Sequence, residues 1–265
     1  MEIIQSTQNS RIKNVQRLST KSKERKEQNL FVIEGARELH LALAGSYLLD
    51  TVFICPELFS ETGYPEIEKE IYSYHPIKVS LSVFQKIAYR EHSDGILALA
   101  KPKSHTLSDL NLPEHPFIIV LEAIEKPGNL GAILRTADAA KVDAVIVCDP
   151  LTDVYNPNVI RSSLGCVFTV PITIACRFDT FSFLKENRIR ILAAELQASQ
   201  EYYNTDFTQA CALIMGTEAE GLTDFWIEHA DDRIKIPMRG KIDSLNVSVS
   251  TAVLTFEAMR QRGFC

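Results

Sequence analysis

The sequence predicts an α/β protein in two parts, a small N-terminal α/β domain followed by a larger α/β domain with a mostly parallel sheet. Apolar runs of strand length alternate along the chain with segments whose apolar residues recur at helical spacing. A polar stretch with three prolines, residues 101–116, interrupts this alternation. The length of 265 residues is enough for two domains of ordinary size.

The first domain is predicted to span residues 1–104. Its apolar runs are short and are separated by helical patterns, as in a small sheet covered by helices. In chain order the elements are strands at 31–33, 51–54, 77–81 and 96–99 and helices at 36–44 and 83–89.

Residues 105–115 are predicted to be a linker and residues 116–265 the second domain. Strands in this part are nearly continuous apolar runs, which is typical of parallel sheets buried on both faces. The predicted strands are 117–121, 144–148, 170–175, 189–194, 212–215 and 234–238. Helices are expected from about Leu130, near Val159, Phe183 and Trp226, and up to Arg262.

Composition excludes several classes of protein. With 46% hydrophobic residues, 11 Gly and 11 Pro, the chain is neither collagenous, of low complexity nor wholly disordered. No apolar run approaches the roughly 20 residues that span a bilayer, and the first residues lack the pattern of a signal peptide, so we expect a cytoplasmic protein without membrane contact. The six cysteines form no C-x-x-C pair and no finger spacing with His, so we expect reduced thiols and no metal site.

Basic residues are concentrated near the N-terminus although the net charge is −6. Residues 11–26 contain seven basic side chains and one acidic side chain. Such a segment either faces the phosphates of a nucleic acid or is an ordinary solvated helix face or terminal arm. The basic residues are Arg11, Lys13, Arg17, Lys21, Lys23, Arg25 and Lys26.

Three loops at the expected carboxyl ends of strands are candidates for ligand binding, because parallel sheets bind ligands there. The chain has no G-x-G-x-x-G after a strand, no phosphate-binding P-loop and no G-x-S-x-G. Rossmann dehydrogenases, P-loop nucleoside triphosphatases and α/β hydrolases therefore have little support.

The first of these loops, residues 125–138, combines a Pro-Gly turn with an amide and an arginine. Asn129 is expected to cap a helix that starts near Leu130. Arg135 lies off the apolar stripe of that helix. It either faces an anionic substrate with its fork of donors or is a surface arginine.

The other two loops follow the strands that end near Gly216 and Pro237. Gly216 and Gly221 bracket Glu218, whose carboxylate either contacts a ligand or lies in an ordinary turn. Residues 236–253 lead into a helix that is apolar nearly all round and is therefore expected to be buried, with Ser244 or Asn246 as its cap. Its polar side chains need partners, which a ligand, a second subunit or local backbone could supply.

Together, and in this order, the loops resemble the SpoU/TrmH family of SPOUT RNA 2′-O-ribose methyltransferases. The N-terminal segments Asn9-Ser10-Arg11-Ile12-Lys13 and Phe31-Val32-Ile33-Glu34-Gly35 resemble the substrate-binding domain that often precedes the catalytic domain. The motifs are Pro127-Gly128-Asn129-Leu130-Gly131 through Arg135-Thr136-Ala137-Asp138, Gly216-x-Glu218-x-x-Gly221, and Ile236-Pro237-Met238 with Ser244-Leu245-Asn246-Val247-Ser248.

This resemblance implies a fold, a cofactor and partners. The second domain would be a SPOUT α/β domain with a C-terminal trefoil knot, active as a homodimer with S-adenosyl-L-methionine. The substrate would be RNA, with ribosomal RNA preferred over transfer RNA. The alternative to an enzyme is a non-catalytic RNA-binding ribosome-assembly factor with the same fold.

The resemblance also implies roles for individual residues. Arg135 would position an RNA phosphate and stabilise the developing alkoxide, since an arginine is a poor proton acceptor at pH 7. The residues that would orient Arg135, the ribose and the cofactor are Asn129, Glu218, Ser244 and Asn246. The cofactor would contact Met215, Gly216, Gly221, Ile236, Met238 and Leu245. RNA would contact Arg11, Lys13, Lys21, Lys23, Arg25 and Lys26.

Overall fold

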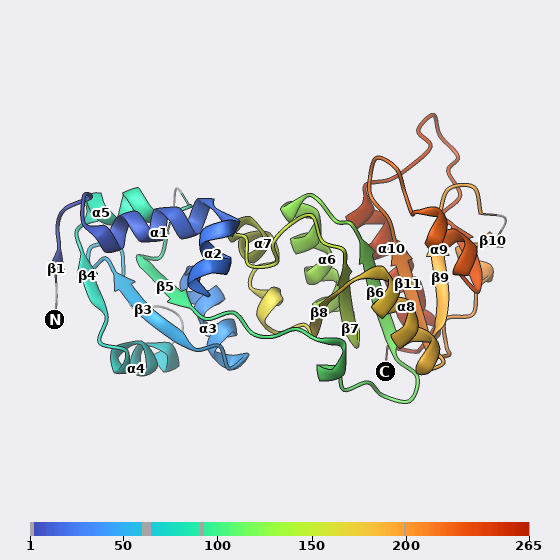
Figure 1. Cartoon of the computed structure of the whole chain (residues 1–265), viewed down its shortest axis with the longest axis horizontal. Helices are drawn as coiled ribbons and strands as arrows, with labels where there is room; N and C mark the ends of the chain where they lie inside the picture. Colours follow the sequence, from blue (N-terminus) through green and yellow to red (C-terminus); the bar gives the residue numbers. More distant parts are fainter. Residues whose placement is uncertain (1–2, 60–64, 91–92, 199, 265) are drawn as a thin grey trace. The chain divides into compact units, whose positions relative to one another are not determined.

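The computed structural model of the chain describes residues 3–59, 65–90, 93–198 and 200–264 (Figure 1). It consists of two compact units. The first contains Met1–Ser104 and Asp153–Thr169, and the second contains His105–Thr152 and Val170–Cys265.

The first unit is built on a five-stranded mixed sheet of order β1-β4-β3-β5-β2. Strand β5 runs antiparallel to β2 and β3, whereas β4 is parallel to β1 and β3. The strands are β1 (Ile3–Ile4), β2 (Phe31–Glu34), β3 (Leu49–Ile54), β4 (Ile77–Val79) and β5 (Ile96–Ala100). All four predicted strands of this part are confirmed, and β1 was not predicted because two residues carry no alternation pattern.

Helices of the first unit bury apolar stripes against this sheet. In α1 the buried residues Ile12, Val15 and Leu18 recur every three positions, and Asn9 caps the helix by accepting a hydrogen bond from the Arg11 N–H at 2.9 Å. The basic side chains of α1 therefore lie on its outer face. The helices are α1 (Ser10–Thr20), α2 (Ser22–Gln28), α3 (Ala36–Ala44), α4 (Pro65–Ser73), α5 (Leu81–Ile87), α7 (Pro157–Ser162) and the 3-10 helix η2 (Cys166–Phe168).

Residues 153–169 complete the core of the first unit although they lie in sequence between two strands of the second. The Tyr155 ring stacks on the Phe31 ring with centroids 4.3 Å apart, and the centroid of the Phe168 ring lies 6.0 Å from that of Phe31. Tyr47 packs edge-on against both Tyr155 and Phe168. Aromatic burial of this kind stabilises the docking of the segment.

The second unit is built on a seven-stranded sheet in which every recorded pair is parallel, in the order β10-β12-β9-β11-β6-β7-β8. This confirms the predicted parallel sheet. The strands are β6 (Phe117–Glu122), β7 (Ala144–Cys148), β8 (Ile172–Ala175), β9 (Arg190–Ala194), β10 (Gln200–Glu201), β11 (Cys211–Met215) and β12 (Asp232–Lys235). Strand β12 starts two residues before the predicted strand 234–238 and ends three residues before its predicted end, so these bounds are corrected to Asp232–Lys235.

Helices cover both faces of the parallel sheet. Leu184 of α8 and Trp226 of α9 pack with alternate strand residues such as Ile118 and Val120 on one face, while α6 and α10 pack against each other. The helices of this unit are α6 (Pro127–Ala139), α8 (Arg177–Glu186), α9 (Asp224–His229) and α10 (Val247–Gln261), with the 3-10 helices η1 (Leu107–Asp109) and η3 (Tyr202–Asn204).

Two helix predictions for this unit need correction. Helix α6 starts at Pro127, with Lys126 in the capping position, so Asn129 lies in its first turn and is not its cap. A proline suits the first turn of a helix because its missing N–H has no partner there in any case. Helix α10 is not buried all round, since Val249 is 47% and Phe256 42% exposed.

The five described cysteines are free, and Cys265 lies outside the described residues. Within the described ranges, no helix is long and apolar enough to span a membrane. No group of three or more His, Cys, Asp or Glu suited to a metal ion occurs in this part of the chain. The trefoil knot stays a prediction.

Candidate active site

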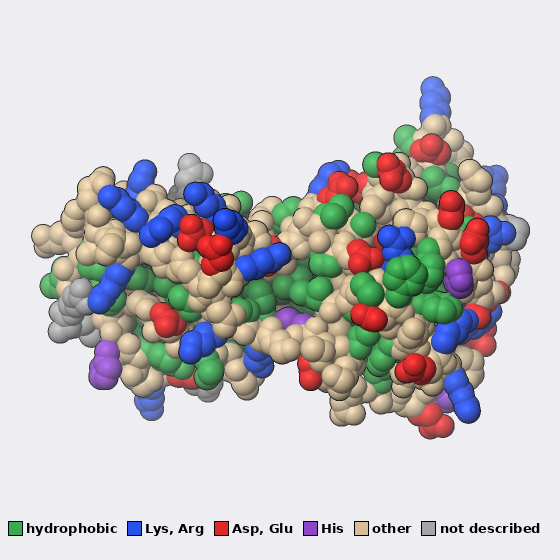
Figure 2. All heavy atoms as spheres, viewed as in Figure 1, with side chains coloured by type: hydrophobic (Ala, Val, Ile, Leu, Met, Phe, Trp, Pro, Cys, Tyr) green, Lys and Arg blue, Asp and Glu red, His purple; other side chains and the backbone are tan. Residues whose placement is uncertain are grey.

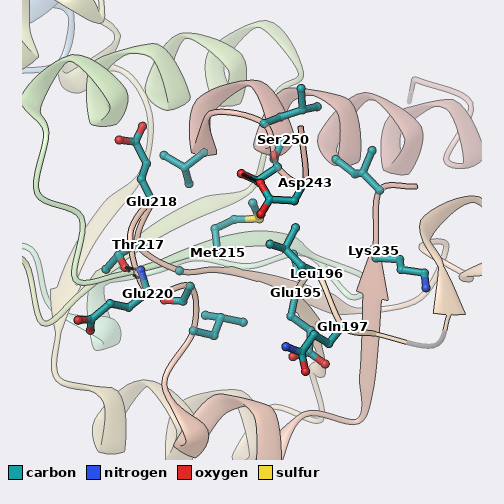
Figure 3. Close-up of a pocket in the computed structure, with 18 of the residues that line it drawn as sticks. Glu195, Leu196, Gln197, Met215, Thr217, Glu218, Glu220, Lys235, Asp243 and Ser250 are labelled. Atoms are coloured by element: carbon teal, nitrogen blue, oxygen red, sulfur yellow. Dashed lines mark hydrogen bonds between the residues drawn. The ribbon is translucent and has the colours of Figure 1, made fainter. Parts of the chain in front are cut away.

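A cavity of about 630 Å³ opens at the carboxyl ends of β9, β11 and β12 in the second unit (Figure 3). Met215, the last residue of β11, and Leu196, which follows β9, line it together with Asp243 from the loop before α10. Small-molecule sites in parallel sheets occur at this edge, because several loops converge there. The cavity is therefore the candidate ligand site of this unit.

The loop after β11 is a tight hairpin that glycines make possible. Thr217 and Gly221 exchange backbone hydrogen bonds, with N–H to O distances of 2.9 and 3.2 Å. Gly221 has a φ of +72°, which favours glycine, and a Cβ on Gly216 would overlap the Gly221 backbone. Both glycines of this motif are thus required by the local geometry.

Behind the hairpin, a buried carboxylate anchors the chain as it enters α9. Glu122, the last residue of β6, is 3% exposed and accepts hydrogen bonds from the N–H and the hydroxyl of Thr223 at 2.9 and 2.7 Å. This contact fixes the C-terminal end of the loop between Gly216 and Gly221, here called the glycine loop.

Three polar side chains from three distant motifs meet beside this hairpin. Glu218 Oε1 accepts a hydrogen bond from Asn129 Nδ2 at 2.5 Å and another from Asn246 Nδ2. Asn246 Nδ2 also donates to Asn129 Oδ1 at 3.3 Å. The tertiary structure therefore joins the first turn of α6, the glycine loop and the start of α10.

The Glu218 carboxylate also forms an ion pair with the ammonium group of Lys126. This contact is the main cause that lowers the pKa of Glu218; burial opposes it, and the hydrogen bond from Asn129 lowers the pKa further. The Glu218 side chain, 24% exposed, is consequently ionised at neutral pH and fully engaged as an acceptor.

Asn246 has two roles, since it also caps α10. Its Oδ1 accepts hydrogen bonds from the N–H and the hydroxyl of Ser248 at 2.9 and 2.6 Å. Capping by Asn246, one of the two predicted candidates, is confirmed. Because the cap occupies Oδ1, the amide nitrogen is directed to Glu218 and Asn129.

The six residues for which cofactor contact was predicted all line the cavity: Met215, Gly216, Gly221, Ile236, Met238 and Leu245. Ser244 lines it as well, and its hydroxyl donates to Asp243 at 3.2 Å.

Arg135 is not part of this polar cluster. Its side chain is exposed, and the described residues provide its guanidinium with no hydrogen bond or ion pair. Asn129 and Arg135 are six positions apart on α6, which places them about 9 Å apart along the helix axis and about 120° apart around it. The two side chains therefore leave the helix in different directions.

Sequence reasoning missed two polar residues of the site. Lys126 pairs with Glu218, and its position directly before the Pro-Gly turn could have signalled it. Glu195 lines the cavity and directly follows β9, so the rule of strand carboxyl ends could have found it.

The basic segment of the first unit forms an exposed patch, with lysine and arginine side chains gathered over α1 and α2 (Figure 2). Arg25 differs from the other six basic residues, because it is 5% exposed and its Nε lies 2.6 Å from Asp153 Oδ2. Its guanidinium is committed to the protein interior and is withdrawn from the predicted phosphate contacts. The exposed residues are Arg11, Lys13, Arg17, Lys21, Lys23 and Lys26.

Comparison with known proteins shows what each part of the chain is similar to. The model of the SpoU rRNA Methylase family matches residues 116–256, and that of the MRM3-like substrate binding domain matches residues 9–98. The 23S rRNA (guanosine-2'-O-)-methyltransferase RlmB of Pectobacterium atrosepticum is 42% identical over 151 residues, which are 57% of this chain and 62% of that relative. The chain thus spans less than two thirds of that protein.

Two further proteins match along nearly their whole length. The 23S rRNA (guanosine(2553)-2'-O)-methyltransferase RlmP of Bacillus subtilis is 29% identical over 257 residues, which are 97% of this chain and 98% of that protein. The crystal structure of an AdoMet bound rRNA methyltransferase from Sinorhizobium meliloti has a TM-score of 0.88 and 26% identity, covering 98% of this chain and 97% of that one.

Proposed function

The chain belongs to the SpoU rRNA methylase family, and on that premise we propose that it transfers a methyl group from S-adenosyl-L-methionine to a ribose 2′-hydroxyl of ribosomal RNA. The observation that supports this most is the meeting of Asn129, Glu218 and Asn246 beside one cavity. The names of the Pectobacterium and Bacillus relatives, which specify 23S rRNA and 2′-O methylation of guanosine, support ribosomal RNA as the substrate.

The cavity fits this cofactor in size and charge. Its volume of about 630 Å³ lies in the range of small-molecule sites. Five carboxylates and one ammonium group line it, and Lys235 points away from Met215 (Figure 3). An acidic lining suits a ligand that carries a sulfonium and an ammonium group. Apolar side chains such as Met215, Ile236 and Leu245 would pack against the adenine.

When bound, the cofactor supplies an electrophilic methyl group, and the protein must position a ribose hydroxyl against it. Glu218 is ionised and accepts hydrogen bonds from Lys126, Asn129 and Asn246. It is therefore a poor proton acceptor and acts by holding the two amides in place. Fixed amide dipoles next to the reacting hydroxyl bind and orient the ribose without reorganisation during the reaction.

Arg135 would act through its charge. An arginine keeps its proton at neutral pH, so Arg135 would contact the RNA phosphate beside the reacting ribose and stabilise the developing alkoxide. Its exposure and freedom from other ion pairs in the described structure leave the guanidinium available for this contact. The proton of the 2′-hydroxyl would leave to a phosphate oxygen or to water as the methyl group is transferred.

The proposal includes a homodimer formed through α10. Val249 and Phe256 are 47% and 42% exposed, and the half-buried Ala252 and Val253 lie between them at helical spacing. These four residues form one apolar stripe on the helix, which a second copy of the chain would cover.

RNA would also be held by the first domain, residues 1–104, through the exposed basic residues of α1 and α2. The linker 105–115 and the catalytic domain 116–265 complete the proposed organisation. With ribosomal RNA as substrate, the proposed location is the cytoplasm.

Transfer of labelled methyl groups from S-adenosyl-L-methionine to unmodified 23S, 16S and transfer RNA tests the proposal. We expect label in a 2′-O-methyl nucleotide of ribosomal RNA with the native chain and at least a 100-fold lower rate with Arg135→Ala. Lys141→Ala, which removes an exposed cation just beyond the end of α6, is the control and should retain activity. Cofactor binding without label in any RNA would favour a non-catalytic protein.

A further inference from the structure

Tyr89 is an exposed aromatic side chain that the first unit holds in a defined place. It is 50% exposed, and the guanidinium carbon of Arg161 lies 5.7 Å from the centre of its ring. Arg161 belongs to α7, so the contact joins two distant segments of the chain. A cation over a tyrosine ring is attracted to its electron-rich face and restrains the ring.

Two buried carboxylates fix the backbone that carries this ring. Glu34, at the end of β2 and 8% exposed, accepts hydrogen bonds from the N–H groups of Tyr89 and Arg90 at 2.6 and 3.2 Å. Glu38 of α3 is fully buried and forms an ion pair with the Arg90 guanidinium. Buried carboxylates are costly unless they are paired, and here their pairing orients two successive residues, one aromatic and one cationic.

The shape of the surface beside Tyr89 favours stacking over insertion. A depression of about 10 Å³, lined by Ser19, Arg90, Ile160 and Arg161 among others, adjoins the ring. This volume holds no more than about one water molecule. A planar group would therefore lie on the exposed part of the ring and would not enter the protein.

The charge around the ring favours RNA over a protein partner. Arg90 and Arg161 flank it, and Ser19 belongs to α1, whose outer face carries exposed basic residues (Figure 2). Glu38 is fully buried and already paired with Arg90, so Arg161, which is exposed, is the cation beside the ring whose charge is available at the surface. Aromatic side chains among basic ones are typical of sites for unpaired nucleotides.

We propose that Tyr89 stacks on an unpaired base of the RNA substrate while Arg161 contacts an adjoining phosphate. This inference rests on the proposed function, because it takes the same RNA as ligand. It uses no residue of the cavity in the second unit, so RNA contact here is separable from cofactor binding.

Three variants test the stacking role: Tyr89→Ala, Tyr89→Phe and, as the matched control, Tyr72→Ala. Tyr72 in α4 belongs to the same unit and is 47% exposed, and no cation lies over its ring among the described residues. The probe is an unmodified 23S ribosomal RNA transcript, bound at one fixed salt concentration and measured by filter retention. Loss of one base–aromatic stack should lower the affinity of Tyr89→Ala roughly 5-fold to 150-fold.

The other variants should behave like the native chain. Tyr89→Phe keeps the ring and Tyr72→Ala leaves the site intact, so both should bind the transcript within about 2-fold of native affinity. Melting temperature and S-adenosyl-L-methionine affinity should be unchanged in all three. A transcript that contains 5-iodouridine should cross-link to the native peptide that carries Tyr89, and this cross-link should be absent from Tyr89→Ala.

The stacking role would be overturned if Tyr89→Ala bound the transcript as tightly as the native chain, or if Tyr89→Ala and Tyr89→Phe lost the same affinity. Either result would leave methylation by the native chain, and so the proposed function, in place. A Tyr89-dependent affinity without methyl transfer would instead refute the proposed function and leave the stacking role in place. A native chain that binds no transcript would overturn both.

Discussion

Breaking the ion pair between Arg25 and Asp153 should destabilise the first unit. Both side chains are largely buried, at 5% and 14% exposure, and Arg25 Nε lies 2.6 Å from Asp153 Oδ2. Arg25 also donates to the Leu18 carbonyl at 2.7 Å, and Asp153 accepts from the Tyr155 N–H at 2.9 Å. The pair therefore ties α1 and α2 to the segment 153–169.

The size of the effect follows from what each substitution leaves behind. Arg25→Ala leaves the Asp153 carboxylate buried without its cation, which costs about 3–5 kcal/mol in comparable pairs. Because Asp153 is 14% exposed, we expect the lower end, about 3 kcal/mol, or roughly a 150-fold larger population of the opened state. The double variant Arg25→Met with Asp153→Leu should recover most of this loss, because no charge is then left unpaired.

Hydrogen exchange followed by mass spectrometry locates the effect. In Arg25→Ala the amides of α1, β2 and α7 should exchange about 100-fold faster, while those of β6 and β11 should not change. Lys26→Ala, at the exposed neighbouring position, is the control and should remain within about 0.5 kcal/mol of the native chain. Equal exchange in Arg25→Ala and Lys26→Ala, or acceleration spread evenly over both units, would refute the reasoning.

Three further predictions concern the second unit. Glu218→Gln should lower methyl transfer at pH 7 at least tenfold. The pKa of Glu218 lies below its ordinary 4.5, so the contribution of the carboxylate is complete above pH 4.5 and fades only as the pH falls through the lowered pKa. A native rate–pH profile with an acid limb between pH 5.5 and 7 that Glu218→Gln lacks would contradict this role. Gly216→Ala should abolish S-adenosyl-L-methionine binding in calorimetry because the new Cβ overlaps Gly221, whereas Gly128→Ala, whose Cβ meets nothing within 4 Å, should bind normally. Phe256→Asp should convert a homodimer into monomers in sedimentation, and an unchanged mass would place the subunit contact elsewhere.

Much of the second unit could be predicted because its signals are local. Five of the six apolar runs predicted as strands of this unit match strands in the structure, since an apolar run of four to six residues is itself the feature that a buried parallel strand requires. The sixth, 234–238, overlaps β12 only at Ile234 and Lys235. The cap at Asn246 is local in the same sense, because its oxygen bonds Ser248 two positions away.

The errors arose where tertiary contacts compete with a local preference. Asn129 is a good capping residue by type, yet its amide donates to Glu218, 89 positions later in the chain. Arg25 looked like one of seven surface cations, and only the fold brings Asp153, 128 positions away, against it. A pattern of charges describes the residues of one segment of the chain. It therefore cannot predict an ion-pair partner that belongs to a different segment.

By itself, then, the sequence determined the α/β alternation and the three loops with their candidate residues, because each depends on side chains a few positions apart. The tertiary structure alone decided that residues 153–169 complete the first core, that Asn129, Glu218 and Asn246 form one cluster, and that Arg135 lies outside it. The physical reason is distance along the chain. Contacts between residues that are tens of positions apart arise from the packing of whole elements, which no local periodicity encodes.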